Sequence, residues 1–288
     1  MEFATKELIE KGWSGDKKYR VSDKEGHRFL LRVSPTDRKD RVESTFHRVQ
    51  KVTELGIPMC ESIEWGECDE GVYVLQTWID GEDAEKVIPG LPDERQYAYG
   101  LDAGRFLRKI HSIPAPNGEQ NWEDYFNQKI DRKLAGYAEC PLKHQNGELM
   151  IDYVQSNRHL LAARPVTYQH GDYHIGNMMI DTEGRLIVID FDKDSYGDPW
   201  EEFNRIVWCA QAAPTFACGI VDGYFDGAVP EEFWRLLALY IATNTVSSLP
   251  WAIPFGQEEI DVMLKQGREV LQWYEGMTNP IPKWYRVR

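Results

Sequence analysis

Hydrophobic and polar positions alternate with a period of two near the start of the chain. Phe29, Leu31 and Val33 fall on one side of this alternation, and Arg28 and Arg32 fall on the other. Successive side chains of a strand point to opposite faces of a sheet, so this period predicts a strand with one apolar face. We expect it over residues 27–33, with further strands at 19–21, 63–65 and 71–78.

The period changes to that of a helix after this strand. Hydrophobic residues then recur every three or four positions, at Val42, Phe46, Val49 and Val52. This spacing places them on one face of an α-helix over residues 36–55. Gly56 and Pro58 follow, and both residue types commonly end helices. Helical spacing also dominates residues 93–163 and the chain beyond residue 199.

The two periods divide the chain into a β-rich part and a helical part. We predict an α+β fold in which residues 1–80 form a small β-rich N-lobe and residues 81–288 form a larger, mainly helical C-lobe. A connector near residues 76–81 would join them. Two short features, residues 167–172 and 185–190, interrupt the helical part, and each lies near a strand of β-branched and apolar residues.

The formal net charge of −14 changes the range of expected partners. An acidic surface repels nucleic acid and anionic membranes and attracts cations. The most apolar long stretch, residues 234–253, contains Arg235 and Asn244, so we predict a buried helix and not a membrane span. The charged N-terminus lacks the apolar core of a signal peptide, and the five cysteines lack C-x-x-C spacing. We therefore expect a cytoplasmic monomer with free thiols that binds neither nucleic acid nor a membrane.

Two segments of the helical part carry candidate chemistry. The first reads H-G-D-Y-H-I-G-N from His170 to Asn177, and the second, I-D-F-D, begins at Ile189. Phosphoryl transfer requires a carboxylate that orients the attacking hydroxyl and oxygen ligands that hold magnesium against the phosphates. Asp172 and Asn177 have the D-x-x-x-x-N spacing of a kinase catalytic loop, and Asp190 follows an apolar strand. Together the two segments predict a kinase.

These segments resemble the Brenner-type loop of the aminoglycoside phosphotransferase family, whose pattern is H-G-D-x-H-x-x-N followed by I-D-F/W. Every fixed position of the first pattern is matched, and so are Ile189, Asp190 and Phe191. The turn at residues 197–199 and the helix at residues 104–112 also resemble family motifs. The resemblance implies a bilobal, protein-kinase-like fold and an enzyme that moves the γ-phosphate of ATP or GTP to a hydroxyl group, with Mg²⁺ as cofactor.

The resemblance also implies a role for each matched residue. Asp172 would be the catalytic base or the group that orients the hydroxyl, and Asn177 and Asp190 would be the magnesium ligands. His170 would brace the loop. Asp198 would order it through a network of hydrogen bonds.

The nucleotide site is expected in the N-lobe. Its candidate residues are Ser14, Gly15, Arg32, Glu43, Gln76, Thr77 and Ile79. The glycine-containing turn would offer backbone amides to phosphate oxygens, and Arg32 would offer a positive fork. Backbone groups of the connector would bind the purine edge. Glu43 would pair with Arg32, although a solvated helix glutamate explains it nearly as well.

The acceptor is suggested by the acidic character of one segment. Residues 181–202 contain eight acidic and two basic residues, and a polycationic acceptor would pair with such carboxylates. We expect an aminoglycoside acceptor, held by Asp194, Glu201 and Glu202. A solvated helix face explains the same pattern, and the fold alone leaves a macrolide, choline, homoserine or a similar metabolite as alternative acceptors.

Two other classes of protein fit parts of the sequence. His170, Asp172 and His174 form an H-x-D-x-H pattern that a metal hydrolase would use, but the other histidines form no comparable cluster. A non-catalytic pseudokinase is the second alternative. The presence of the base and both magnesium ligands argues against it, and Arg32 in place of a lysine is its partial support.

Overall fold

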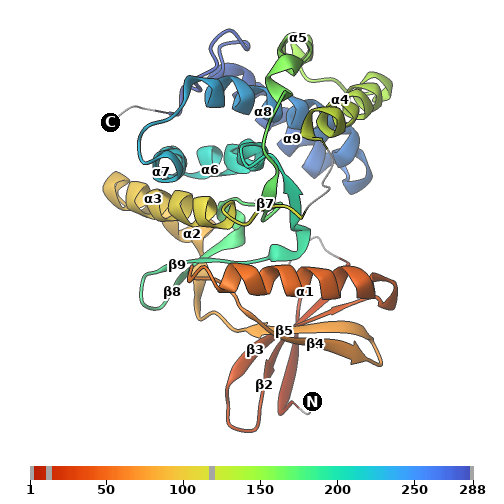
Figure 1. Cartoon of the computed structure of the whole chain (residues 1–288), viewed down its shortest axis with the longest axis vertical. Helices are drawn as coiled ribbons and strands as arrows, with labels where there is room; N and C mark the ends of the chain where they lie inside the picture. Colours follow the sequence, from red (N-terminus) through yellow and green to blue (C-terminus); the bar gives the residue numbers. More distant parts are fainter. Residues whose placement is uncertain (1–2, 11–14, 117–120, 286–288) are drawn as a thin grey trace. The chain divides into compact units, whose positions relative to one another are not determined.

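The computed structural model describes residues 3–10, 15–116 and 121–285. The chain forms two compact units, which can be followed in Figure 1. Unit 1 comprises Met1–Val87 and Gly176–Asp194, and unit 2 comprises Ile88–Ile175 and Ser195–Arg288. The chain therefore returns to unit 1 at residues 176–194. The predicted division, with a single boundary at residue 80, does not include this return.

Unit 1 contains a five-stranded antiparallel sheet with strand order β1-β2-β3-β5-β4. The strands are β1 (Thr5–Ile9), β2 (Lys17–Ser22), β3 (Arg28–Ser34), β4 (Ser62–Cys68) and β5 (Gly71–Thr77). Leu31 lies opposite Leu75, and these two residues form a buried cluster with Val21 and Val33. The apolar face predicted from the alternation along β3 is thus buried, and Arg32 and Ser34 on the opposite face are buried as well.

A helix follows the third strand, as the sequence pattern predicts. After a short 3-10 turn, η1 (Thr36–Arg38), α1 runs over Lys39–Thr53. Val49 and Val52 are buried, and α1 contacts β4 and β5. The hydrophobic stripe of the helix therefore covers the sheet.

A second, three-stranded sheet completes unit 1. Its order is β6-β8-β9, with β6 (Gly81–Asp83), β8 (Met178–Asp181) and β9 (Leu186–Val188), and α2 (Ala84–Val87) contacts β8. Val188 exchanges backbone hydrogen bonds with Pro58 and Cys60, each 3.0 Å long. These bonds attach the β8–β9 hairpin to the segment before β4. The hairpin begins after η4 (Ile175–Asn177) and is followed by η5 (Phe191–Lys193).

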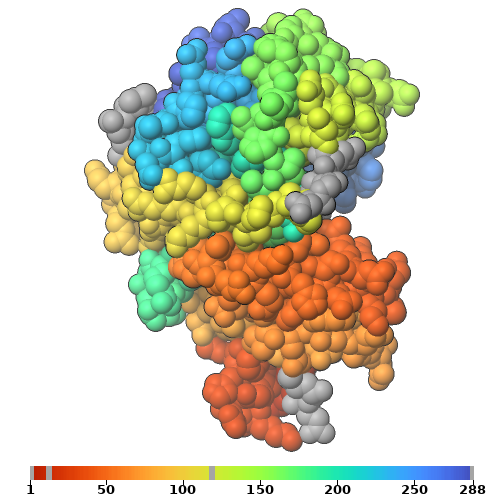
Figure 2. All heavy atoms as spheres, viewed as in Figure 1, coloured from red at the N-terminus to blue at the C-terminus, as the bar shows by residue number. Residues whose placement is uncertain are grey.

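Unit 2 is mainly helical. Its helices are α3 (Asp93–Ile110), α4 (Trp122–Glu139), α5 (Gly147–Asn157), α6 (Ile206–Ala212), α7 (Pro214–Phe225), α8 (Glu231–Ala252) and α9 (Gln257–Trp273). Its 3-10 turns are η2 (Ile88–Gly90), η3 (Arg158–Leu161), η6 (Glu201–Arg205) and η7 (Ile253–Phe255), and β7 (Thr167–Gln169) pairs with β10 (Ser195–Gly197). The exposed side of α3 is visible in Figure 2, where this helix is coloured yellow.

Helix α8 lies in the core of unit 2. It contacts α4, α5 and α9, and most of its side chains are buried. Residues Glu231–Phe255 are long and apolar enough to cross a membrane by length and composition alone, yet 72% of the apolar window is buried inside the protein. This burial is that of a core helix, which is what the polar residues within the stretch predicted.

Helices α3 and α7 meet through glycines. A Cβ atom on Gly104 would lie 2.1 Å from the Ile220 carbonyl oxygen, and one on Gly100 would lie 2.3 Å from the Phe216 carbonyl oxygen. On α7, Gly219 and Gly223 approach α3 in the same way. Only residues without a side chain permit this approach of two backbones.

Candidate active site

The candidate metal ligands of unit 1 lie at one end of the β8–β9 hairpin. Asn177 directly precedes β8, and its carbonyl oxygen accepts a hydrogen bond of 3.0 Å from the Ile189 amide. Asp190 is the next residue and has a left-handed backbone conformation, with φ of 68°. A non-glycine residue in this conformation is strained, and such residues are concentrated at functional sites. The hairpin thus brings Asn177 and Asp190 together, although they are 13 positions apart in the chain.

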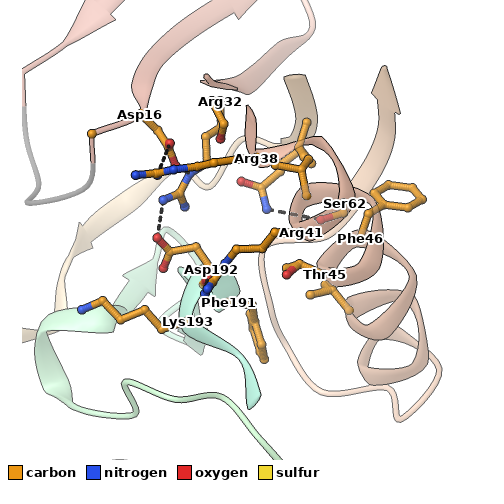
Figure 3. A pocket seen from close by; sticks show the side chains of 16 residues that line it. Asp16, Arg32, Arg38, Arg41, Thr45, Phe46, Ser62, Phe191, Asp192 and Lys193 are labelled. Carbon is orange, nitrogen blue, oxygen red and sulfur yellow. Dashed lines mark hydrogen bonds and ion pairs between the residues drawn. The ribbon is translucent and has the colours of Figure 1, made fainter. Parts of the chain in front are cut away.

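Arg32 is surrounded by three carboxylates. Its Nε donates to Asp16 Oδ2 at 2.6 Å, one terminal nitrogen donates to Asp190 Oδ1 at 2.8 Å, and the other donates to Asp192. Figure 3 shows the Arg32 guanidinium between Asp16 and Asp192. Lys18, which lies opposite Arg32 on β2, is 3.5 Å from Asp190. We call Arg32, Asp16, Asp190 and Asp192 the Arg32 cluster.

Electrostatic interactions within the Arg32 cluster set the charge of its members. Burial alone would lower the pKa of Arg32, but the charges of Asp192, Asp190 and Asp16 raise it above its ordinary value. Burial alone would raise the pKa of Asp190, whereas the charges of Arg32 and Lys18 lower it. Asp190 is therefore an ionised carboxylate at neutral pH, as a metal ligand must be.

Glu43 does not occupy the position expected for the partner of Arg32. Among the described residues, the carboxylates that contact Arg32 are those of Asp16, Asp190 and Asp192. The residues of α1 that line the adjacent cavity are Arg41, Val42, Thr45, Phe46 and Val49, and Glu43 is not among them. Glu43 follows Val42 and is rotated by about 100° around the helix axis, so its side chain points elsewhere.

The other nucleotide candidates are distributed around a cavity of about 420 Å³ in unit 1, shown in Figure 3. Gly15, Arg32 and Gln76 line it, as do three further cations, Arg38, Arg41 and Lys193. Thr77 ends β5, where its hydroxyl accepts a 2.9 Å hydrogen bond from the Glu61 amide. Ile79 is half-buried between β5 and β6, and Ser14 lies outside the described residues.

In unit 2, a buried glutamate holds the loop that carries Asp172. Glu202 is 3% exposed and accepts hydrogen bonds from the amides of His170, at 2.9 Å, and Gly171, at 2.6 Å. The His111 ring nitrogen Nε2 lies 3.0 Å from the same carboxylate. Sequence reasoning placed Glu202 at the acceptor, but these contacts direct its carboxylate to the loop.

Asp172 is partly exposed, with 14% of its side chain accessible. Arg205 Nε lies 3.2 Å from its Oδ1, and His174 Nε2 lies 3.7 Å from the same oxygen. The Asp172 amide donates to His170 Nδ1 at 3.3 Å. His170 is fully buried, which agrees with a bracing role.

Asp198 forms the hydrogen-bond network predicted for it. It is fully buried and accepts two bonds from Arg164, at 2.7 and 3.0 Å. Tyr240 donates to it at 2.6 Å and the Trp200 amide at 2.9 Å. Its own carbonyl oxygen accepts from Gln169, the last residue of β7. Asp198 thus anchors the strand that leads into the His170 loop.

The remaining two acidic acceptor candidates also have cationic partners. Asp194 belongs to unit 1, where Arg48 and Thr45 of α1 donate to its buried carboxylate. Glu201 belongs to unit 2 and accepts a 3.0 Å bond from Lys129. The three predicted acceptor carboxylates therefore do not form one acidic wall within a unit.

A second cavity, of about 240 Å³, lies in unit 2. Gly171 and Arg205 line it, and these residues are the sequence neighbour and the ion-pair partner of Asp172. The lysines Lys129 and Lys133 of α4 line it as well. Sequence reasoning did not identify the basic residues of this cavity.

A family model described as "APH: Phosphotransferase enzyme family" matches residues 6–235. No curated protein matches the sequence.

Similar solved structures cover nearly the whole chain. A thermostable mutant of aminoglycoside phosphotransferase APH(4)-Ia, in ternary complex with ADP and hygromycin B, has a TM-score of 0.66 and 14% identity over 93% of this chain and 94% of that chain. Amicoumacin kinase hAmiN, in complex with AMP-PNP, Ca²⁺ and Ami, has a TM-score of 0.66 and 13% identity over 98% and 91%. A choline/ethanolamine kinase family protein from Mesorhizobium loti has a TM-score of 0.66 and 18% identity over 95% and 90%. The likeness confirms the predicted kinase-like α+β fold.

Proposed function

Because the chain belongs to the phosphotransferase enzyme family, as the match over residues 6–235 shows, we propose that it is a kinase that phosphorylates a hydroxyl group of a small molecule. The observation that carries the proposal is the arrangement of unit 1. An ionised Asp190 lies at the same hairpin end as Asn177 and is held by Arg32. In unit 2, a partly exposed Asp172 is carried by a loop that Glu202 fixes.

The proposed reaction needs few protein groups. The acceptor oxygen forms a bond to the γ-phosphorus of the nucleotide while the bond from that phosphorus to the β-phosphate oxygen breaks. Asp172 orients the acceptor hydroxyl and receives its proton, which then passes to solvent. The products are a nucleoside diphosphate and the phosphorylated acceptor.

The donor atoms of Asn177 and Asp190 are suited to Mg²⁺. Oxygen ligands, including an ionised carboxylate, are the ones that hard divalent cations prefer. Asp190 meets this requirement because neighbouring charges keep its pKa low. Mg²⁺, when bound, would neutralise charge on the phosphates, and Arg32 would add a fixed positive group beside it.

Two kinds of observation support a nucleoside triphosphate as co-substrate: the comparison with solved structures and the geometry of unit 1. Solved structures of similar proteins hold ADP or AMP-PNP. In unit 1, four cations line the cavity that contains Gly15 and Gln76, and cations are what phosphate groups require. The choice between ATP and GTP stays a prediction for the assay below.

The acceptor class remains a separate proposal. The neighbour that holds hygromycin B supports the aminoglycoside hypothesis, and the amicoumacin and choline/ethanolamine kinases support other acceptors. The acidic wall that motivated the first hypothesis is not present within either unit among the described residues, because Asp194, Glu201 and Glu202 are all engaged with cations or with backbone amides.

The test is a nucleotide-consumption assay. Purified protein with Mg²⁺ and ATP or GTP would be screened against aminoglycosides, macrolides, amino alcohols and sugar acids, with diphosphate formation as the readout. Asp172→Asn should abolish acceptor-dependent turnover, whereas Asp152→Asn, an exposed carboxylate change on α5, should not. A wild-type protein that consumes no more nucleotide than Asp172→Asn, with every acceptor, would contradict the kinase proposal and favour a pseudokinase.

A further inference from the structure

The cavity of unit 2 has a basic lining in an acidic protein. Of the described residues that line it, Lys129, Lys133 and Arg205 are basic, and Glu201 is acidic. The whole chain has a net charge of −14, so this local excess of cations is opposite to the average surface. A concave site with an excess of one charge concentrates ligands of the opposite charge.

The three basic residues of the cavity lining come from two elements, α4 and η6. Lys129 and Lys133 are four residues apart on α4, so they lie on the same helix face. Arg205 is the last residue of η6, which also carries Glu201. Glu201 pairs with Lys129 at 3.0 Å, and Arg205 pairs with Asp172 at 3.2 Å. The remaining basic side chain of the cavity is that of Lys133, whose charge an anionic ligand would balance.

Lys133 is held in an environment that disfavours its charge. Its Nζ donates to Asn244 Oδ1 of α8 at 3.2 Å, and Asn244 also lines the cavity. Burial lowers the pKa of Lys133 to about 7, with the charges of Lys129 and Arg205 adding to the effect and that of Glu201 opposing it. A lysine in such a position carries a stability cost that an anionic ligand would offset.

The remaining lining is suited to a small polar molecule. Amide and hydroxyl groups of Gln169, Ser195 and Asn204 line the cavity, and Trp122, Tyr125 and Tyr196 provide aromatic surface. Its volume of about 240 Å³ is below the roughly 300–1,000 Å³ that is usual for drug-sized ligands. Polar groups with an aromatic wall suit a short hydroxylated carbon chain or a single sugar ring.

We propose that this cavity binds the acceptor through an anionic group, so that the substrate is a small hydroxylated molecule carrying a carboxylate or a phosphate. Lys133, with Lys129 and Arg205 beside it, contacts the anionic group, and the acceptor hydroxyl lies toward Asp172, which Arg205 contacts from the same cavity. The inference rests on the proposed kinase function for its meaning as an acceptor site, but the binding of the anion does not depend on catalysis.

The binding test uses matched probes that differ in one group. Glucuronate, glucose 6-phosphate, glucose and glucosamine share a sugar ring, and glycerate, glycerol 3-phosphate, glycerol and 2-amino-1,3-propanediol share three carbons. Dissociation constants would be measured by calorimetry on the full chain, with and without Mg²⁺ and AMP-PNP. We expect at least one anionic probe of a set to bind about 10–100-fold more tightly than its neutral match, the range of a charge-assisted hydrogen-bonded contact. Comparing the carboxylate and phosphate arms identifies the anion.

Variants assign the effect to the cavity. Lys133→Met keeps the length of the side chain and removes its charge, and it should abolish most of the preference for the anionic probe while leaving the weak affinity for the neutral probe unchanged. Lys265→Met removes an exposed lysine of α9 that does not line the cavity, and it should change neither affinity. A structural role of Lys133 would weaken all probes alike.

The pH dependence provides a second readout. The charged groups facing Lys133 are Lys129 of α4 and Glu201 and Arg205 of η6. Because Lys133 loses its proton as the pH rises through about 7, affinity for the anionic probe should fall between pH 6 and pH 8.5 in the wild type. This fall should be absent in Lys133→Met.

The outcomes separate the inference from the kinase proposal. Equal or tighter binding of the neutral or cationic probes, no binding of any anionic probe, or an unchanged preference in Lys133→Met would overturn the inference. Anion binding that depends on Lys133, together with no diphosphate formation for any acceptor, would support the inference and contradict the kinase. Turnover confined to neutral or cationic acceptors would retain the kinase and reject the anionic acceptor.

Discussion

The two units contain charge clusters of different composition, since carboxylates and cations are interleaved in unit 1 and basic side chains prevail in unit 2. In unit 1, the guanidinium of Arg32 is in contact with three carboxylates, those of Asp16, Asp190 and Asp192. In unit 2, three basic side chains line a cavity whose described lining contains one carboxylate, that of Glu201. A partly buried charge without a full complement is costly, so a ligand that completes each cluster would be stabilised there. We proposed above a divalent cation beside Asp190 in unit 1 and an anionic group beside Lys133 in unit 2.

The difference also shows why the net charge of the chain is a poor guide to its ligands. A value of −14 suggests a cationic acceptor, yet the acidic residues on which that suggestion depended are already engaged. Local geometry, and not the sum over the chain, determines which charges a ligand meets.

The largest effect should come from the reacting carboxylate. Asp172→Asn should lower kcat by about 10²–10⁴, because a positioned proton acceptor is lost while the surrounding loop is kept. Nucleotide affinity should remain near that of the wild type. The measurement is steady-state kinetics with nucleotide titration, and Asp152→Asn serves as the exposed control. A near-normal kcat would remove Asp172 from the reaction.

Removing one acid from the Arg32 cluster tests the cation side of the comparison. Asp190→Ala should raise the Mg²⁺ concentration needed for half-maximal nucleotide binding by about 10–100-fold. Loss of a residue that only orients a metal ligand typically weakens metal binding by this factor, and loss of the ligand itself should weaken it at least as much. Asp172→Ala should have a smaller effect. Titration of Mg²⁺ at fixed nucleotide compares the two variants, and an unchanged Mg²⁺ requirement in Asp190→Ala would contradict the ligand role.

A smaller effect is expected from the residue that positions the loop. Glu202→Gln retains the shape of the side chain but weakens the hydrogen bonds from His170 and Gly171, and bonds to a charged group contribute about 1.5–3 kcal/mol. We expect kcat to fall roughly 5–30-fold, with little change in the KM for nucleotide. Glu232→Gln, an exposed change on α8, is the control. A rise in the KM for the acceptor alone would instead indicate substrate contact.

The smallest expected effect concerns the free energy of unfolding. It differs from the preceding effects because the substitution should improve the property that is measured. The lowered pKa of Lys133 means that the unfolded chain binds more protons than the folded one between pH 7 and the ordinary lysine pKa, so the free energy of unfolding rises with pH in this window. Lys133→Met should therefore be more stable than the wild type at pH 7, by about 1–2 kcal/mol. Thermal unfolding should show a Tm higher by roughly 2–6 °C. A lower Tm would indicate that the lysine stabilises the fold.

Features encoded within one segment were predictable from the sequence. The alternation of Phe29, Leu31 and Val33 identifies β3 because a strand places such residues on one face. Asp172 and Asn177 were recognisable because their spacing belongs to a single loop. The three-residue strands β6 and β10 were missed, since so short a strand has no period to detect.

Features that depend on distant segments were not predictable in the same way. Asp16 and Asp192 contact Arg32 from positions 16 and 160 residues away, whereas Glu43 was chosen because it lies on the next helix. Glu202 was placed at the acceptor because an acidic run does not reveal which member is buried. For the cavity of unit 2, the available signal was the pair of lysines four residues apart on α4, near Trp122.

The glycine contact between α3 and α7 has a mechanical consequence. With no side chain as a spacer, the two backbones touch, and neither helix can slide or roll without a collision. Tyr173, next to Asp172, donates a 2.7 Å hydrogen bond to the Ala103 carbonyl oxygen of α3, so the loop is fastened to this rigid pair. We therefore expect α3 and α7 to move as one body. Their amides should be among the slowest to exchange with deuterated solvent.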